Sequence, residues 1–326
     1  MTIQNRFFAL LLILLYNSLF ASTDILTAYR LNGIQDIEQK LDKDLTDISY
    51  WREFLKDKDT KFGYIESYTN VLLCDKEKSE LFIYMKDSNN RYQLKQEYSA
   101  FTGKRKGDKI KEGDLKTPIG VYNIVKKISK VDSFYGPMAF VTSYPNLYDK
   151  YRGKTGKGIW IHGLPTNQKR DAFTKGCIAI NNKNIESLNK NINIKKTVLI
   201  IKEDTNSTNT PSKETLARLL SELYAWRYAW IYNNIDDYLH FYSKEFKRYD
   251  GMDFQNFKKY KTRIFNKNEN KTIIFTKINI LAYPNRKNLY KITFYEKYKS
   301  DSFSFNGEKV LIAKLQNNKL HIITER

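Results

Sequence analysis

Short apolar runs separated by turn-forming residues fill the middle of this 326-residue chain, and they limit its possible folds more than any other feature. The runs occupy residues 81–85, 120–125, 138–141, 158–161 and 197–201. Each has four to six residues, which is the length of a strand rather than a helix. The pattern predicts a mostly β domain of roughly 130 residues, over residues 68–203.

Helical periodicity precedes this domain. Apolar residues recur there at steps of three and four, which predicts an amphipathic helix or helix pair within residues 22–67. The apolar stripe consists of Ile34, Ile37, Leu41, Leu45, Ile48, Trp51 and Leu55. The pattern leaves open whether the stripe packs on its own domain or forms a homodimer contact.

The pattern of apolar and polar residues changes again after the β domain. Residues 204–212 have no apolar side chain, which predicts a linker over 204–214. Helices are expected at 216–230 and 235–246, and strands at 272–281, 289–298, 309–315 and 320–323. Helices followed by antiparallel strands indicate a separate α+β domain over residues 215–326. The expected fold is therefore multidomain.

Residues 1–21 have the make-up of a secretory signal peptide. Arg6 precedes an apolar run of about a dozen residues, and the small Ala21 comes just before a polar segment. A membrane span needs roughly 20 apolar residues, so the run is too short to favour one. We therefore expect export, with a membrane tether as the alternative if the signal stays uncleaved.

The formal net charge of +20 favours anionic partners, such as nucleic acid, acidic lipid or a polymer that carries carboxylates. Export argues against nucleic acid, and the sequence has no nucleic-acid-binding signature. The basic segment at residues 104–111 fits either plain solubility or docking to an anionic substrate.

The chain has only two cysteines, so its core rather than a disulfide framework must stabilise it. Cys74 ends an apolar run and is expected to fill the core. A Cys74–Cys177 disulfide is the alternative. The sequence contains no HExxH, no CxxC and no His/Asp cluster with ligand spacing, so we expect neither a metal nor another cofactor.

His162 and Cys177 are the residues of the β domain best suited to chemistry. A cysteine nucleophile needs a partner that takes its proton, and histidine has a suitable pKa. The preceding Gly176 permits a tight turn, which would place the amides of Gly176 and Cys177 as an oxyanion hole. Taken without their context, the two residues fit a buried structural pair better.

The context of these residues resembles the L,D-transpeptidase catalytic (YkuD-type) family. His162-Gly163 and the later Thr174-Lys175-Gly176-Cys177 match its HG and S/T-x-GC signature. Upstream, residues 113–122 (GDLKTPIGVY) are similar to a second family landmark, and residues 144–146 and 158–160 match further features. The resemblance covers residues 68–202.

The three-part layout also resembles the L,D-carboxypeptidase branch that sets cell shape in curved and helical Gram-negative bacteria. That branch has a helical segment before the catalytic domain and a nuclear-transport-factor-like α+β cone after it. The resemblance implies a β-rich catalytic sandwich, a periplasmic location and peptidoglycan stem peptides as substrate. The aromatic residues around His240 fit either core packing or a pocket for glycan or peptide.

Carried onto this sequence, the resemblance makes Cys177 the nucleophile and His162 the proton acceptor and donor. The carbonyl of Gly163 would hold the imidazole in the productive tautomer. Attack on the stem peptide followed by water gives a carboxypeptidase, and attack by a second stem's amine gives a transpeptidase. A non-catalytic wall-binding module is the alternative from another class.

The sequence departs from the family at two positions: Lys175 stands where many members have His, and Ala179 where many have Arg or Asn. Because Ala179 cannot bind a carboxylate, we expect nearby cations to hold the terminal carboxylate of the substrate. The candidates are Lys175 first, then Arg152, Lys154 and Lys116. Thr174 and Trp160 complete the expected substrate-binding set. The layout and Ala179 favour hydrolysis.

Overall fold

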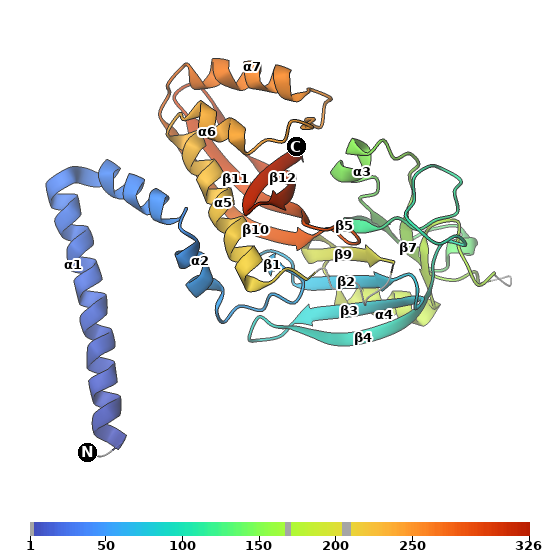
Figure 1. The fold of residues 1–326 in the computed structure, drawn as a ribbon. Coiled ribbons are helices and arrows are strands. Elements are labelled where there is room, and N and C mark those ends of the chain that lie inside the picture. The colour runs from blue at the N-terminus through green and yellow to red at the C-terminus, as the bar shows by residue number, and fades with distance from the viewer. Residues whose placement is uncertain (1–2, 167–170, 204–209) are drawn as a thin grey trace.

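The computed structural model describes residues 3–166, 171–203 and 210–326, with side chains from residue 24 onward. The side chains of the expected signal peptide and residues 204–209 of the expected linker lie outside that description. Within the described part, no helix is both long enough and apolar enough to cross a membrane. Figure 1 shows a helical arm, a β-barrel and a helix-covered sheet, which we call the cone.

The expected β domain is a closed barrel with the strand order β2-β3-β4-β8-β7-β6-β5-β9. Its strands are β2 (Asn70–Asp75), β3 (Glu80–Lys86), β4 (Tyr92–Phe101), β5 (Gly120–Ile128), β6 (Ala139–Thr142), β7 (Trp160–His162), β8 (Ile178–Ile180) and β9 (Thr197–Lys202). Two pairs, β2 with β9 and β7 with β8, are parallel.

Strands β2 and β9 are almost wholly apolar because both of their faces are covered. Leu72 and Leu199 point into the barrel core. Val71 and Val198 point outward into a second cluster, which also contains Leu281 of the cone. Short helices α3 (Leu147–Tyr151), α4 (Asn182–Asn191), η1 (Ser133–Tyr135) and η2 (Ile194–Lys196) connect the barrel strands.

The cone is the expected C-terminal α+β domain. Its elements are α5 (Lys213–Ile231), α6 (Ile235–His240), α7 (Phe254–Phe265), β10 (Lys271–Ala282), β11 (Leu289–Ser300), β12 (Ser304–Gln316) and β13 (Lys319–Glu325). The helix expected at 235–246 ends at His240, and α7 was not expected. A short strand from before the barrel, β1 (Tyr64–Ile65), pairs with β10 and completes a five-stranded sheet.

The N-terminal segment forms α1 (Ile3–Asp44), with a non-helical residue at Gly33, and α2 (Ile48–Leu55). Trp51 and Leu55 are buried in the cone core, so the second half of the predicted apolar stripe packs on the cone. Ile34 and Leu41 are 62% and 49% exposed, whereas Ile37 between them is buried, so the first half of the stripe is only partly covered.

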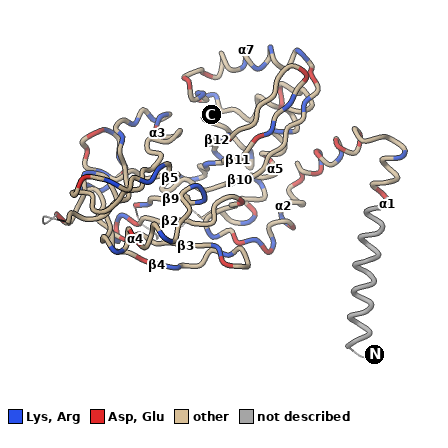
Figure 2. Tube along the Cα trace, turned by 180° about the vertical axis from the view of Figure 1, so that it is seen from behind, with Lys and Arg blue, Asp and Glu red and all other residues tan. Residues whose placement is uncertain are grey.

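Tyr283 of the cone docks onto the barrel. Its hydroxyl accepts a hydrogen bond from Asn146 Nδ2 at 3.1 Å, and its ring meets that of Tyr148 edge to face. Asn146 Nδ2 also donates to the Val121 carbonyl of β5 at 3.0 Å. This contact fixes the cone against the barrel wall. Basic side chains are spread over both parts rather than gathered in one patch (Figure 2).

Candidate active site

Strand β7 carries His162 in the middle of a row of small side chains. His162 pairs with Ala139 of β6 on one side and with Ala179 of β8 on the other. Two alanines leave space beside the imidazole. Because Ile161 and Ile178 point into the barrel core, the alternation of a strand places His162 and Ala179 on the outer face. Cys177 directly precedes Ile178, which pairs with Ile161, so the backbone brings Cys177 next to the strand that carries His162.

The His162 side chain is only 1% exposed and is fixed by its neighbours. Its Nδ1 lies 2.6 Å from the Gly163 carbonyl, the contact that the resemblance implies. A proton on Nδ1 donates to that carbonyl and leaves Nε2 as the basic nitrogen. Tyr135 packs edge to face on the imidazole at 5.0 Å and also contacts Trp160 at 5.2 Å.

Sequence reasoning missed Tyr135. The sequence did contain a signal. Aromatic and turn-forming residues come just before the strand expected at 138–141, and a ring there lies beside the strand that pairs with it. Its carbonyl accepts from the Gly163 amide at 2.9 Å, so Tyr135 contacts the His162-Gly163 dipeptide with both backbone and ring. The predicted Trp160 is half-buried beside it.

Cys177 is partly exposed, and its thiol donates to the Gly158 carbonyl at 3.4 Å. Gly176 before it has φ +135°, and a Cβ there would lie 2.9 Å from the Lys116 carbonyl. Only glycine fits both requirements without strain. The nucleophile turn therefore packs directly against the segment that carries the GDLKTP motif.

Two expected roles in this turn are wrong. The Gly176 amide donates to Thr174 Oγ1 at 2.9 Å, so it is not available as an oxyanion donor. The Thr174 hydroxyl in turn donates to the Cys177 carbonyl at 2.7 Å, and Thr174 is buried. Thr174 therefore shapes the turn and cannot bind substrate. The Cys177 amide stays a predicted oxyanion donor.

Asp114 builds the loop behind the turn. Its carboxylate accepts from Lys109 Nζ at 2.9 Å and from the amides of Ile110, Lys111 and Lys116 at 2.7, 3.0 and 3.2 Å. Burial alone would raise the pKa of Asp114, but these hydrogen bonds outweigh it and lower the pKa to about 2. The motif's aspartate thus holds the Lys116 carbonyl against Gly176.

The predicted carboxylate-binding cations separate into two groups. Lys154 is 1% exposed and pairs with Asp108 and Asp149, each at 2.8 Å, so its expected role in binding substrate is wrong. Arg152 pairs with the same Asp108 at 2.9 Å. These ion pairs tie the basic loop to α3. Lys175 is exposed and Lys116 half-buried, so both stay candidates.

Cys74 is fully buried in the barrel core, and burial raises the pKa of its thiol to about 12. Both cysteines are free, so the alternative of a Cys74–Cys177 disulfide is not realised. In the described ranges, no group of three or more His, Cys, Asp or Glu side chains is placed to hold a metal ion.

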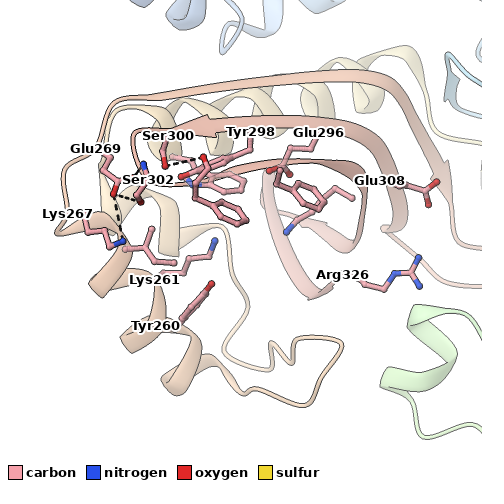
Figure 3. A pocket seen from close by; sticks show the side chains of 15 residues that line it. Tyr260, Lys261, Lys267, Glu269, Glu296, Tyr298, Ser300, Ser302, Glu308 and Arg326 are labelled. Atoms are coloured by element: carbon pink, nitrogen blue, oxygen red, sulfur yellow. Dashed lines mark hydrogen bonds and ion pairs between the residues drawn. The ribbon is translucent and has the colours of Figure 1, made fainter.

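A second concave site lies in the cone, away from Cys177. Its volume is about 490 Å³, and its wall includes Trp230, Tyr260, Lys261, Glu296, Tyr298 and Lys309. Figure 3 shows Tyr260 and Lys261 extending from α7 toward strand β11, which carries Glu296 and Tyr298.

Buried charges make this pocket unusual. Burial lowers the pKa of Lys261 to about 8 and raises the pKa of Glu296. Within the described part of the chain, Glu296 Oε2 has no hydrogen-bond partner. His240, whose aromatic neighbours fitted either core packing or a pocket, is exposed and does not line this pocket. Its neighbours Tyr238 and Tyr242 are core residues instead.

Comparison with known proteins agrees with this architecture. Residues 69–201 match the L,D-transpeptidase catalytic domain family (YkuD), and residues 218–326 match the Cds6 C-terminal NTF2-like domain family. The chain is 34% identical over 115 residues to the putative L,D-transpeptidase YafK of Escherichia coli K12, which is 35% of this chain. The match spans only 43% of that curated relative's length.

Solved structures resemble the chain over more of its length. The helical cell shape determining protein Pgp2 from Campylobacter jejuni is 38% identical, with a TM-score of 0.79 over 86% of this chain and 100% of that one. Bd1075 of Bdellovibrio bacteriovorus is 27% identical, with a TM-score of 0.66 over 82% of this chain and 97% of that one. The chain therefore belongs to the YkuD-type L,D-transpeptidase family, in the branch whose members add a C-terminal NTF2-like domain.

Proposed function

We propose that this protein is an exported, periplasmic peptidoglycan L,D-carboxypeptidase that removes the terminal D-alanine from tetrapeptide stems and so tunes cell shape. The observation that supports the proposal is that Cys177 directly precedes β8, which pairs with the strand of His162, while the imidazole Nδ1 lies against the Gly163 carbonyl. That arrangement gives a thiol a base of the right tautomer.

In the proposed reaction, His162 takes the Cys177 proton, and the thiolate attacks the carbonyl between the L-centre of meso-diaminopimelate and D-alanine. The imidazolium then protonates the departing amine, which leaves a thioester on Cys177. His162 next takes a proton from water, and the resulting hydroxide releases the tripeptide and regenerates the thiol. The Cys177 amide donates to the developing oxyanion.

Transpeptidation differs only in the second step, where the amine of another stem replaces water. Hydrolysis is favoured because Ala179 offers no side chain that would hold a second stem beside the thioester.

Incubation of the purified protein with tetrapeptide muropeptides, followed by mass spectrometry, tests the proposal. Loss of one alanine supports the carboxypeptidase, and a new cross-linked dimer refutes it in favour of the transpeptidase. An unchanged substrate, with the fold intact, leaves the wall-binding module as the function.

We propose further that the cone pocket binds the same polymer, because a cation and an anion lie together in an aromatic-lined cavity. The stem peptide carries both carboxylates and an amine. Calorimetry with Cys177→Ala protein and a tetrapeptide muropeptide tests this. Lys261→Met, added to Cys177→Ala, should abolish binding of the muropeptide at the cone pocket. Lys258→Met, at an exposed position of α7, should leave that binding unchanged.

A further inference from the structure

Asn182, the first residue of α4, reaches the peptide unit that orients His162. Its Oδ1 accepts a hydrogen bond from the Leu164 amide at 2.7 Å. The carbonyl of that same peptide unit belongs to Gly163 and contacts His162 Nδ1 at 2.6 Å. One planar group therefore connects Asn182 to the imidazole.

The geometry of a trans peptide explains how this connection restrains the Gly163 carbonyl. The C=O and N–H of one unit point in opposite directions and rotate together. Holding the Leu164 N–H on Asn182 therefore fixes the direction of the Gly163 C=O. A hydrogen bond to the N–H also polarises the unit and makes its carbonyl a better acceptor.

Close packing shows that the asparagine oxygen has a tightly defined place. A Cβ added at Gly163 would lie 2.3 Å from Asn182 Oδ1, and one added at Gly136 would lie 2.5 Å from the same atom. The oxygen thus lies in a narrow gap between Gly136 and Gly163, and a side chain at either position would displace it. The Gly163 amide is held separately by the Tyr135 carbonyl.

We propose that Asn182 is a positioning residue for the proposed cysteine chemistry, acting on His162 through the Gly163–Leu164 peptide unit. This inference rests on the proposed function. Asn182 touches neither substrate nor thiol in this role. It keeps the Gly163 carbonyl on Nδ1, which favours the tautomer with a basic Nε2 and stabilises the imidazolium that pairs with a Cys177 thiolate.

The neighbouring Asn181 supplies a matched control. Asn181 is the N-cap of α4, and its side chain accepts from the Lys183 amide at 3.0 Å. Asn181→Ala removes a helix cap without touching the Gly163–Leu164 unit. A purely structural role for this turn predicts similar effects for both alanine variants, whereas positioning predicts an effect of Asn182→Ala alone.

The test is the rate of Cys177 alkylation by iodoacetamide from pH 5 to 8.5, read by mass spectrometry of the Cys177 peptide. Tyr135, whose ring packs edge to face on the imidazole, is unchanged in every variant compared. Thiolate is the reacting species, and a rise of about one unit in the thiol pKa lowers the rate about tenfold at pH values below the wild-type midpoint.

We expect Asn182→Ala to move the profile about one unit to higher pH and to slow alkylation about tenfold below the wild-type midpoint. Asn181→Ala should match the wild type, and Asn182→Asp, which keeps an acceptor oxygen, should restore the rate. His162→Ala is the reference for a lost base. If His162→Ala slows the reaction and folded Asn182→Ala does not, the positioning role is wrong while the His–Cys pair stands. If neither variant differs from the wild type, the proposed function itself fails.

Discussion

Asp114→Asn tests whether the GDLKTP loop supports the nucleophile turn. The substitution removes the charge that pairs with Lys109 and that accepts three backbone amides. Asparagine keeps one acceptor oxygen but places an NH₂ group where amides now donate. The loop should therefore open more often, and the Lys116 carbonyl behind Gly176 should lose its fixed position.

The magnitude follows from the pKa of Asp114, which falls from an ordinary 3.8 to about 2 in the folded protein. The difference corresponds to about 2 kcal/mol at pH 7. The side chain is 9% exposed, so solvent screening removes little of it. Since the pKa is lowered on folding, this contribution is complete above pH 4 and disappears as pH falls toward 2.

Hydrogen exchange of the peptide spanning residues 107–118 is the assay. About 2 kcal/mol corresponds to roughly 30-fold more frequent opening, so the Ile110, Lys111 and Lys116 amides should exchange about 30-fold faster at pH 7. Glu112→Gln, at an exposed position of the same loop, is the control. Equal exchange in Asp114→Asn and wild-type protein would refute the reasoning.

Other substitutions separate chemistry from packing. Cys177→Ala should abolish turnover and leave the thermal unfolding midpoint unchanged, and retained trimming of tetrapeptide would remove the nucleophile from the mechanism. Cys74→Ala should stay active and lose about 1–3 kcal/mol in urea unfolding, because it truncates a buried side chain. Lys175→Met should raise KM for tetrapeptide about tenfold but matter much less for a substrate with an amidated terminal carboxylate; equal effects on both would exclude a carboxylate contact. Lys154→Met should cost about 3–5 kcal/mol of stability by leaving the buried Asp149 without its cation, while Asp108 keeps Arg152, with KM unchanged in the folded fraction. A raised KM without a loss of stability would show instead that Lys154 contacts the substrate.

Much of the barrel was predictable because its central strands are buried on both faces. Strands β2 and β9 read as unbroken apolar runs for that reason. Strand β4 was missed because one face is exposed and carries Lys95 and Glu97 among its apolar residues. Strand β8 was missed because it has only three residues. Helix α7 was missed because the buried Lys261 interrupts the stripe of Phe254, Phe257, Ile264 and Phe265.

Local motifs were enough to propose a nucleophile and a base, whereas the partners of charged residues could not be predicted from them. Lys154 looked like a substrate cation because Asp108 is distant in sequence and the ion pair exists only in the folded chain. The same limit hid Asn182, which follows the cysteine by five residues and reads as an ordinary helix start. Contacts across the fold decide whether such a side chain supports the site or binds at it.

The place of β1 has a consequence for how the chain can be divided and built. Trp51, Leu55 and Tyr64 precede the barrel but belong to the cone core, and β1 pairs with β10. Topologically, the barrel is an insertion within the cone. During synthesis these residues are made before the barrel, and their packing partners in the cone are made after it. The cone therefore has a slow, non-local assembly step. A recombinant cone cut at residue 213 would lack part of its own interior and one strand of its sheet. Fusing residues 45–66 to it through a flexible linker should restore the cooperative unfolding of an independent domain.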